Sequence, residues 1–534
     1  MKIAYINPKM PDSLWSFDSL VPILGRCSVA PLGLATAMAL TPSHWEVEVF
    51  DEEIAPIDLD TDADLVALTA FNVQANRAFE IARAFSERGK YVAFGGPYAT
   101  LCPDKVRPHA NALILGDCEY VWPEFLADFE RGTPRETYHE TRLVDIKDSP
   151  CPADERLDYK RYLSFPVQRS RGCPFLCEFC DIPVTAGRVP RTKTVPQVMK
   201  EIEKLHRLGV KSIMFSDANF IGNPKYTVQL LEEVTRFNES NNFPISFFCE
   251  ATLNLVKHDR ILELMRRANF EALLIGVESP RKSSLIETRK MQNTRFSISE
   301  AIRKVHSYNI MVVTGMIVGF DNDDTDIFQE QFDFLMEVGT PFTTAGLLVA
   351  VELTPLYERL KREGRLLEHT HTFENRQVHG SSDVNFVPML MTREQMIDGY
   401  NWLIRALYSY DNYSRRLLRG LEAFDPARSN WRQANTYMAR FVFKLLRHYL
   451  LTRDAARRRF FLGTLARAIT RRPCGSKVMT ALTFIAMHAH FHEFVTRKHG
   501  DPERVTAGSP FARSVVAARS NPQAIHHPVH AVPH

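Results

Sequence analysis

The sequence contains no apolar run long enough to cross a membrane. A spanning helix needs roughly 18 uncharged apolar residues, and no stretch of the 534 residues provides them. The chain begins MKIAYINPKM, which predicts a strand and lacks the pattern of a secretion signal. The formal net charge of +3 is too small to indicate nucleic-acid binding over the whole chain. These absences predict a cytoplasmic protein with no nucleic-acid partner.

The nine cysteines form no disulfide framework, which agrees with a reducing compartment. Six of them have no regular spacing, and for each we expect a free thiol in a core. These six are Cys27, Cys102, Cys118, Cys151, Cys249 and Cys474. The other three, Cys173, Cys177 and Cys180, lie in one short segment with the spacing Cys-x-x-x-Cys-x-x-Cys.

This three-cysteine segment is an incomplete ligand set. Structural zinc sites and electron-transfer clusters normally use four protein ligands, so a [4Fe-4S] cluster bound by three cysteines leaves one iron open to another molecule. There are two alternatives to a cluster: the three cysteines are free thiols, or they bind a zinc whose fourth ligand lies elsewhere. The cluster is favoured because the segment follows a strand-like stretch, Phe165 to Gln168, that opens a strand and helix series.

Residues 1–150 alternate short apolar runs with helical stretches, which predicts an open parallel sheet wrapped by helices. Such sheets bind ligands at the carboxyl ends of their strands. The predicted strand ends carry Thr69, Gly95, Gly96 and Gly116, whose small size lets a ligand approach the backbone. A tight turn at Gly95 and Gly96 explains these glycines equally well.

Residues 160–368 predict six further strands separated by helices, the count of a partial (β/α)6 barrel. The expected strands are 165–170, 212–216, 246–250, 272–277, 311–318 and 344–349. Polar residues follow several of them, where reactive groups of such barrels gather. They are Asp217, Asn219, Glu250, Glu278 and Ser279. Helix capping or pairing with a lysine are the alternative roles for the carboxylates.

Residues 369–505 are predicted to be helical and basic, and 506–534 to be a disordered tail. From Asp411 to Gly500 there are 18 Lys and Arg against 5 acidic residues, mixed with apolar stretches. A basic amphipathic surface that lies on anionic lipid is one interpretation, and a solvated helical cap over the barrel is the other. His488, His490 and His492 lack a neighbouring carboxylate cluster, so a metal site there is not favoured.

Three segments closely resemble the class B, cobalamin-dependent radical S-adenosylmethionine (SAM) methyltransferases, in particular the hopanoid C-2 methylases and bacteriochlorophyllide side-chain methyltransferases. They are 172–183 (GCPFLCEFCDIP), 219–223 (NFIGN) and 249–254 (CEATLN). The resemblance covers nearly the whole chain. It implies an α/β fold with an N-terminal doubly wound cobalamin-binding-type domain, a central TIM-like radical SAM barrel and a C-terminal helical region.

The resemblance also implies the cofactors and the residues that bind them. Cys173, Cys177 and Cys180 would hold a [4Fe-4S] cluster whose open iron chelates SAM. Phe179, Asp217, Asn219, Glu250, Glu278 and Ser279 would contact SAM or substrate. Thr69, Gly95, Gly96 and Gly116 would bind cobalamin, without a histidine ligand because the sequence has no Asp-x-His-x-x-Gly. A domain that has lost cobalamin remains the alternative.

Two segments depart from the family pattern. Ser216 to Asn219 replaces paired aspartates, which puts a SAM or substrate contact in doubt. Glu352 to Pro355 replaces Pro-Gly-Thr-Pro, and we expect this change to affect only a loop.

The implied reaction begins when an external donor of the flavodoxin or ferredoxin type reduces the cluster. The electron of the reduced cluster splits SAM into methionine and a 5'-deoxyadenosyl radical. This radical removes hydrogen from an unactivated carbon of the substrate, and the carbon radical then takes methyl from methylcobalamin. No acid–base residue is required, and none is assigned.

The expected substrate is a small molecule or lipid, with a hopanoid-like lipid first and a tetrapyrrole side chain second. We expect the enzyme to reach it by peripheral contact with the inner membrane face. A radical SAM enzyme without methyl transfer and a non-catalytic iron-sulfur sensor are the rival functions.

Overall fold

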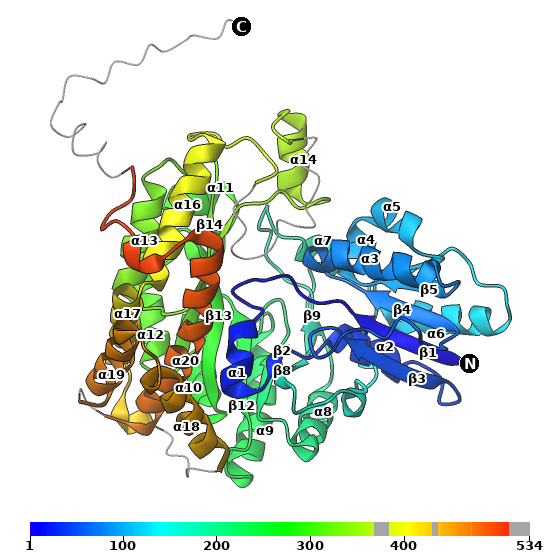
Figure 1. The fold of residues 1–534 in the computed structure, drawn as a ribbon, viewed down its shortest axis with the longest axis horizontal. Coiled ribbons are helices and arrows are strands. Elements are labelled where there is room, and N and C mark those ends of the chain that lie inside the picture. The colour runs from blue at the N-terminus through cyan, green and yellow to red at the C-terminus, as the bar shows by residue number, and fades with distance from the viewer. Residues whose placement is uncertain (368–383, 430–435, 471–472, 512–534) are drawn as a thin grey trace, which may run out of the picture.

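The computed structural model of the protein describes residues 1–367, 384–429, 436–470 and 473–511. Three parts lie side by side in Figure 1: a sheet domain formed by the N-terminal residues, a central curved parallel sheet with outer helices, and a group of C-terminal helices. This is the α/β fold class that the sequence predicts. In the part of the chain described here, no helix is both long enough and apolar enough to cross a membrane.

The N-terminal domain is a six-stranded parallel sheet of order β3-β1-β4-β5-β6-β7. The strands are β1 (Lys2–Asn7), β3 (Glu46–Asp51), β4 (Leu65–Thr69), β5 (Tyr91–Gly95), β6 (Ala112–Leu115) and β7 (Thr137–His139). The helices are α2 (Leu32–Ala39), α3 (Ala75–Ser86), α4 (Pro97–Leu101), α5 (Pro103–Val106) and α6 (Cys118–Glu130).

Alternate residues of β1 pack on opposite faces of this sheet. Tyr5 lies in the core shared with α2 and α6, whereas Ile6 lies in the core shared with α3 and α4. The chain order reverses between β1 and β4, and open α/β sheets bind ligands at the carboxyl ends of the strands where this reversal occurs.

The central sheet has seven parallel strands in the order β15-β14-β13-β12-β11-β8-β2. The six predicted strands are present as β8 (Tyr162–Val167), β11 (Ser212–Phe215), β12 (Ser246–Ala251), β13 (Phe270–Glu278), β14 (Met311–Val318) and β15 (Thr343–Leu347). The helices between them are α8 (Val195–Leu208), α9 (Pro224–Ser240), α10 (Asp259–Arg267), α12 (Ile298–His306) and α13 (Ile327–Val338). Shorter elements are β9 (Ser170–Arg171), β10 (Arg191–Thr192), α7 (Ile182–Thr185), α11 (Lys282–Glu287) and α14 (Pro355–Arg362).

The seventh strand, β2 (Cys27–Val29), comes from the N-terminal region and pairs with β8. The chain before it, which includes α1 (Val21–Leu24), also packs outside the N-terminal sheet. The rings of Trp15 and Phe342 lie 4.8 Å apart, and the backbone oxygen of Ser13 lies 2.9 Å from Nε2 of His490. Part of the predicted 1–150 domain therefore packs with the barrel and the C-terminal helices.

The C-terminal helices are α16 (Arg393–Tyr408), α17 (Tyr410–Glu422), α18 (Thr436–Leu450), α19 (Ala455–Thr470) and α20 (Gly475–His499). His488 and His490 are fully buried in this group, and each places Nε2 2.9 Å from a backbone oxygen. Each contact satisfies one ring nitrogen, and Nδ1 of both histidines has no hydrogen-bond partner among the described residues.

The chain stays packed beyond residue 506, where the sequence predicts the tail to begin. The Thr506 backbone oxygen accepts a hydrogen bond from Trp402, and Phe511 packs near Phe328. The predicted tail from 512 onward lies outside the described residues. The side chain of Cys27 also lies outside them, whereas Cys102, Cys249 and Cys474 are buried as predicted. Cys118 and Cys151 are only partly buried.

Candidate active site

Cys173, Cys177 and Cys180 lie in the loop that follows β8 and β9, at the carboxyl end of the first barrel strand. The loop is held by its own backbone, since Cys173 N donates to Gly187 O at 3.1 Å and Cys180 N donates to Cys177 O at 3.2 Å. Among the described residues, no three His, Cys, Asp or Glu side chains converge on a point where one metal ion could be held. Thiols that each bind a different iron of a cluster do not need such a point.

A buried ion pair anchors the residues just before the cysteine loop. Arg169 Nε lies 2.5 Å from Asp217 Oδ2, and both side chains are at most 1% exposed. Asp217 Oδ1 also accepts hydrogen bonds from the backbone N–H groups of Arg169 and Ser170, at 2.9 and 2.8 Å. Both carboxylate oxygens of Asp217 thus contact the protein. Asp217 therefore holds the backbone just before the cysteine loop, and its contact with a cofactor stays a prediction.

The other side of the cysteine loop rests on the segment that follows β13. Gln292 Nε2 lies 3.7 Å from the sulfur of Cys177. Glu178 N donates to Thr288 O at 3.0 Å, and its carboxylate pairs with Arg359 of α14 at 2.5 Å. The loop is therefore fixed from both sides by elements of the barrel.

Glu278 ends β13 in an uncommon backbone conformation. Its φ is +68°, in the left-handed region that non-glycine residues rarely adopt. Its carboxylate forms a buried ion pair with Lys290 at 2.5 Å. A Cβ at Gly276 would lie 2.3 Å from Glu278 Oε1, so this arrangement requires glycine at 276. Strained residues of this kind cluster at functional sites, and its partner Lys290 lies 5.9 Å from the Phe179 ring of the cysteine loop.

Glu250, at the end of β12, has a carboxylate for which the described residues provide no hydrogen-bond partner. Burial, with a smaller effect of Asp217, raises the pKa of Glu250 to about 7. A desolvated carboxylate without a partner is poorly stabilised unless a cation or donor approaches it. Of the predicted barrel residues, Glu250 is therefore the one best suited to bind a cationic group of a ligand.

The remaining predicted barrel residues contact the protein itself. Asn219 Oδ1 accepts from Ile221 N and from Thr252 Oγ1, both at 3.3 Å. Ser279 is fully buried and accepts from Arg281 N at 3.2 Å. The ring of Phe179 lies 5.9 Å from that of Phe320 and 5.9 Å from Lys290 Nζ. Of these residues only Phe179, which is partly buried, lies within the cysteine loop.

Thr69 and Gly95 end β4 and β5, and Gly96 and Gly116 follow β5 and β6, all at one edge of the N-terminal sheet, as predicted. The close contacts at two of the glycines are made with the protein. A Cβ at Gly96 (φ +91°) would lie 2.4 Å from Thr69 Oγ1, and one at Gly116 (φ +81°) would lie 2.4 Å from Glu140 O. Glycine is thus required at 96 and 116 by the fold, whether or not a ligand is bound.

Ion pairs join this edge of the N-terminal sheet to the cysteine loop. Arg171, two residues before Cys173, donates to Glu119 at 2.7 Å and lies 3.1 Å from Asp117. Asp117 and Glu119 follow β6 directly, and the Glu119 side chain is 1% exposed. Arg191 adds a second contact to Asp117 at 3.4 Å. The carboxyl ends of both sheets therefore meet at the cysteine loop.

A second link between the two sheets involves Glu352, in the loop after β15. Glu352 pairs with Lys105 of α5 at 3.0 Å and accepts a hydrogen bond from Cys102. Its neighbour Leu353 has φ +67° and is 52% exposed. The sequence predicts that this departure from the family pattern affects only a loop. The structure corrects that expectation, because Glu352 connects the two domains.

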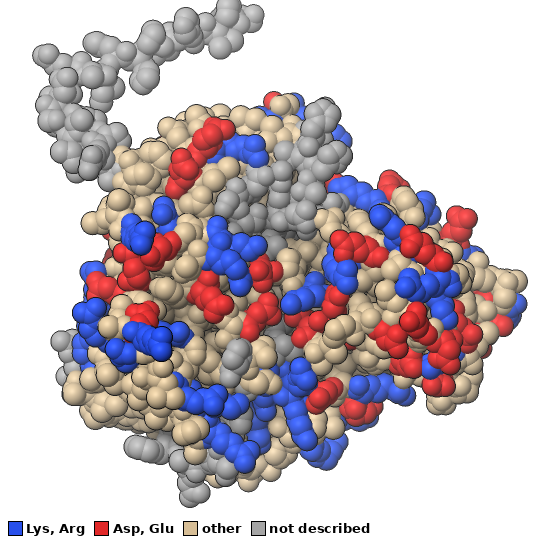
Figure 2. All heavy atoms as spheres, viewed as in Figure 1, with Lys and Arg blue, Asp and Glu red and all other residues tan. Residues whose placement is uncertain are grey.

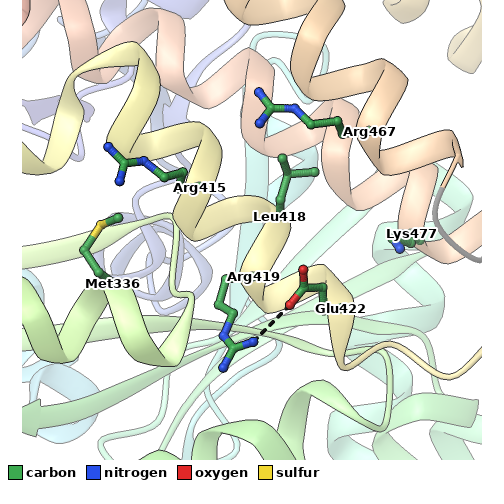
Figure 3. Close-up of a pocket in the computed structure, with 7 residues that line it drawn as sticks. All are labelled: Met336, Arg415, Leu418, Arg419, Glu422, Arg467 and Lys477. Atoms are coloured by element: carbon green, nitrogen blue, oxygen red, sulfur yellow. Dashed lines mark hydrogen bonds and ion pairs between the residues drawn. The ribbon is translucent and has the colours of Figure 1, made fainter.

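A pocket of about 340 Å³ lies elsewhere, among α13, α17, α19 and α20 (Figure 3). It is lined by Met336, Arg415, Leu418, Arg419, Glu422, Arg467 and Lys477. None of the predicted site residues lines it. It is separate from the strand ends where the candidate site lies.

Comparison with known families agrees with this arrangement. Residues 167–335 match the radical SAM superfamily, and residues 354–502 match a domain of unknown function, DUF4070. A methyltransferase of Synechocystis sp. that is itself uncharacterised is 34% identical over 393 residues, 73% of each chain. The hopanoid C-2 methylase of Rhodopseudomonas palustris is 33% identical over 405 residues, 74% of this chain and 75% of that protein.

Solved structures share the fold at low sequence identity. The cobalamin-dependent SAM radical enzyme OxsB, solved with aqua-cobalamin and SAM bound, matches with a TM-score of 0.58 at 16% identity, over 97% of this chain and 80% of that one. The methyltransferase TsrM from Kitasatospora setae, solved with cobalamin and a [4Fe-4S] cluster bound, gives 0.54 at 15% identity, over 68% of this chain and 78% of that one.

A three-cysteine loop at the first strand of a parallel half-barrel, joined to the ligand-binding edge of an open α/β sheet, defines a radical SAM enzyme with an added N-terminal domain. The chain belongs to the radical SAM methyltransferases. The solved structures that share its fold hold the cofactors that the sequence predicts, cobalamin with a [4Fe-4S] cluster in one and aqua-cobalamin with SAM in the other. The relatives that are named as methyltransferases favour methyl transfer over the two rival functions, a radical SAM enzyme without methyl transfer and a non-catalytic sensor.

Sequence reasoning missed the residues that hold the site together. Arg169 and Arg171 adjoin the cysteine motif, and their position there is a signal that could have identified them. Glu119 falls at a predicted strand end beside Gly116 and could have been found in the same way. Lys290 has no local signal, because only the folded chain places it against Glu278.

Proposed function

We propose that the protein transfers a methyl group from methylcobalamin to an unactivated carbon of a hydrophobic substrate, with a hopanoid-like lipid favoured over a tetrapyrrole side chain. The observation that carries the proposal is the contact between the two sheet edges. Arg171 pairs with Glu119 and Asp117, and Glu352 pairs with Lys105. A methyl carrier at the N-terminal edge would therefore face the carboxyl ends of the barrel strands.

The barrel residues suit the first two cofactors. Cys173, Cys177 and Cys180 would hold the cluster, and Glu250 would accept a hydrogen bond from the amino group of SAM, since its carboxylate has no described partner. When bound, the three cofactors supply the radical and the methyl group. The protein's own part is to fix the geometry, through Asp217 and Gln292 beside the cysteine loop, and to exclude water.

The N-terminal edge suits a large flat cofactor. Thr69 and Gly95 end neighbouring strands, and Phe71 follows β4 with 59% of its surface exposed. An exposed aromatic ring beside small residues, at the point where the strand order reverses, provides an apolar surface for a corrin. Cobalamin would bind there through backbone groups and packing, without a histidine ligand.

The substrate proposal rests on the relatives. One is named for hopanoid C-2 methylation at 33% identity, whereas the bacteriochlorophyllide d C-12(1)-methyltransferase of Chlorobaculum tepidum is 27% identical over 72% of this chain and 84% of that protein. The hopanoid-like substrate therefore comes first. We further propose that an external flavodoxin or ferredoxin reduces the cluster.

Iron content and product mass test this function. Anaerobically reconstituted protein should hold one four-iron cluster, which Cys173→Ala, Cys177→Ala or Cys180→Ala removes, whereas Cys474→Ala, a buried thiol outside the spaced set, leaves it intact. Lipids of cells with the gene should include a product heavier by one methylene than those of cells without it. Methylation of a tetrapyrrole instead would transfer the assignment to the second substrate, and a water-soluble product would overturn the hydrophobic class.

A further inference from the structure

Helix α18 exposes an apolar face. Phe443 is 67% exposed, Leu446 36% and Leu450 39%, and Leu451, just after the helix, is 79% exposed. The spacings of three and four residues place Phe443, Leu446 and Leu450 on one side of the helix. Contiguous exposed apolar side chains of this size mark an interaction surface.

The opposite side of α18 anchors it in the protein. Leu445 is fully buried and Tyr449 is 1% exposed. The Tyr449 hydroxyl donates to Ile485 O of α20 at 2.7 Å, and its ring stacks on Phe461 of α19 at 5.0 Å. Because one side of the helix is packed, the apolar residues on the other side are presented outward in the folded protein.

Basic residues flank the apolar face. Arg440, Arg447 and Arg453 are exposed, and none forms an ion pair with a described acidic residue. From residue 439 to 462 the sequence has seven Lys and Arg against one acidic residue, Asp454. Figure 2 shows basic atoms and little acidic surface at the lower part of the molecule, where Figure 1 places α18.

Not every arginine of this region is available for an external partner. Arg457 lies over the Tyr449 ring, 5.2 Å from its centroid, and Arg458 donates to the Thr452 backbone oxygen. The exposed arginines on α18 and just after it are therefore Arg440, Arg447 and Arg453. Together with Phe443, Leu446, Leu450 and Leu451, these three arginines are called the α18 face below.

We infer that the α18 face binds the surface of an anionic lipid bilayer, with its apolar side chains inserted among the lipids and its arginines at the headgroups. A helix with one apolar side bordered by cations has the composition of an interfacial helix. Unpaired positive charge makes the face complementary to anionic lipid and disfavours a second copy of the same basic face. The inference rests on the proposed function, since it gives a hydrophobic substrate a route to the enzyme.

Co-sedimentation of the full-length protein with vesicles tests the inference without cofactors or turnover. The wild type should bind vesicles of phosphatidylglycerol and phosphatidylcholine at low salt, bind more weakly as salt rises, and ignore pure phosphatidylcholine. Phe443→Ser with Leu450→Ser should weaken binding by at least about tenfold. Arg440→Glu with Arg447→Glu should weaken it by at least about 20-fold.

A matched control changes charge at the other end of the molecule. Lys361→Glu with Arg362→Glu makes the same charge change on exposed positions of α14, which lies far from α18 in Figure 1, and it should bind vesicles as the wild type does. Each variant should keep wild-type activity on detergent-solubilised substrate, which separates failed docking from a wrong substrate. Equal binding by wild type and α18 variants, or no binding at low salt, would overturn the inference. So would a dimer in solution that Phe443→Ser with Leu450→Ser converts to monomer.

Discussion

Arg171 and Glu119 connect the cysteine loop to the N-terminal sheet by a hydrogen bond of 2.7 Å between nearly buried side chains. Arg171 lies two residues before the first cysteine, and Glu119 lies in the first turn of α6, just after β6. The Arg171 guanidinium thus holds the cysteine loop against the edge of the N-terminal sheet at which we propose that cobalamin binds.

Replacing Glu119 by glutamine should weaken this connection and leave the cysteine loop intact. We expect full iron content and near-normal formation of 5'-deoxyadenosine, with methylated product reduced roughly 10- to 100-fold because small misplacements of reacting groups have effects of that size. Glu124 lies on the same helix as Glu119 and forms a surface pair with Arg135, so Glu124→Gln is the control. If Glu119→Gln lowers both products equally, the contact does not align the two domains.

Asp217→Asn tests the anchor of the cysteine loop. It leaves the buried Arg169 guanidinium without its counter-ion, and breaking a buried pair in this way destabilises a protein by about 3–5 kcal/mol. Chemical denaturation should show this loss, and iron content should fall with it. The exposed pair Arg267 and Glu239 provides the control, since Glu239→Gln should change stability by less than about 1 kcal/mol. A stable, iron-loaded Asp217→Asn protein would contradict the anchoring role.

Glu250 gives a prediction that depends on pH. Its pKa in the fold is raised to about 7, so the folded state retains a proton that the unfolded chain releases near pH 4.5. Stability is thus lost as pH rises between these values. Without cofactors, Glu250→Gln should be more stable than the wild type by about 3 kcal/mol at pH 8 and about 1 kcal/mol at pH 5. It should also bind SAM more weakly. A difference independent of pH would show that Glu250 is not desolvated.

Leu353→Gly tests the strained residue beside Glu352. The left-handed conformation is unfavourable for leucine by roughly 1–2 kcal/mol, and glycine loses about 0.5–1 kcal/mol through its freer unfolded state. The variant should therefore match or exceed wild-type stability by up to about 1 kcal/mol in urea unfolding. If the strain is kept because Leu353 contacts the substrate, kcat/KM should fall while stability does not. A clear loss of stability would instead mean that the exposed side chain packs in the fold.

Sequence periodicity was enough to predict both parallel sheets. Runs such as 65–69 and 311–318 are short, apolar and bounded by polar turns, and both form strands as expected. Strand β2 could not be predicted in this way. It has three residues and is stabilised by pairing with β8, more than 130 positions later in the chain. Periodicity reports local order and carries no information about such a distant partner.

The candidate site shows the same limit. The spacing of Cys173, Cys177 and Cys180 carries its chemistry locally, so the sequence identified the loop. The roles of Asp217 and Gly96 depend on neighbours in space. Asp217 pairs with Arg169, and Gly96 makes room for Thr69, so a bulky residue at 96 would disturb the fold as well as any cofactor. A strand-end position alone does not distinguish a ligand contact from a structural one.

Methyl transfer from SAM labelled with a deuterated methyl group is the most direct test of the account. Reduced, cobalamin-loaded enzyme should give a substrate product that carries the intact labelled methyl, with one 5'-deoxyadenosine and one S-adenosylhomocysteine formed per product. The contrary result would be steady formation of 5'-deoxyadenosine while no product of the hydrophobic substrates carries the label. That result would contradict the proposed methyl transfer to these substrates.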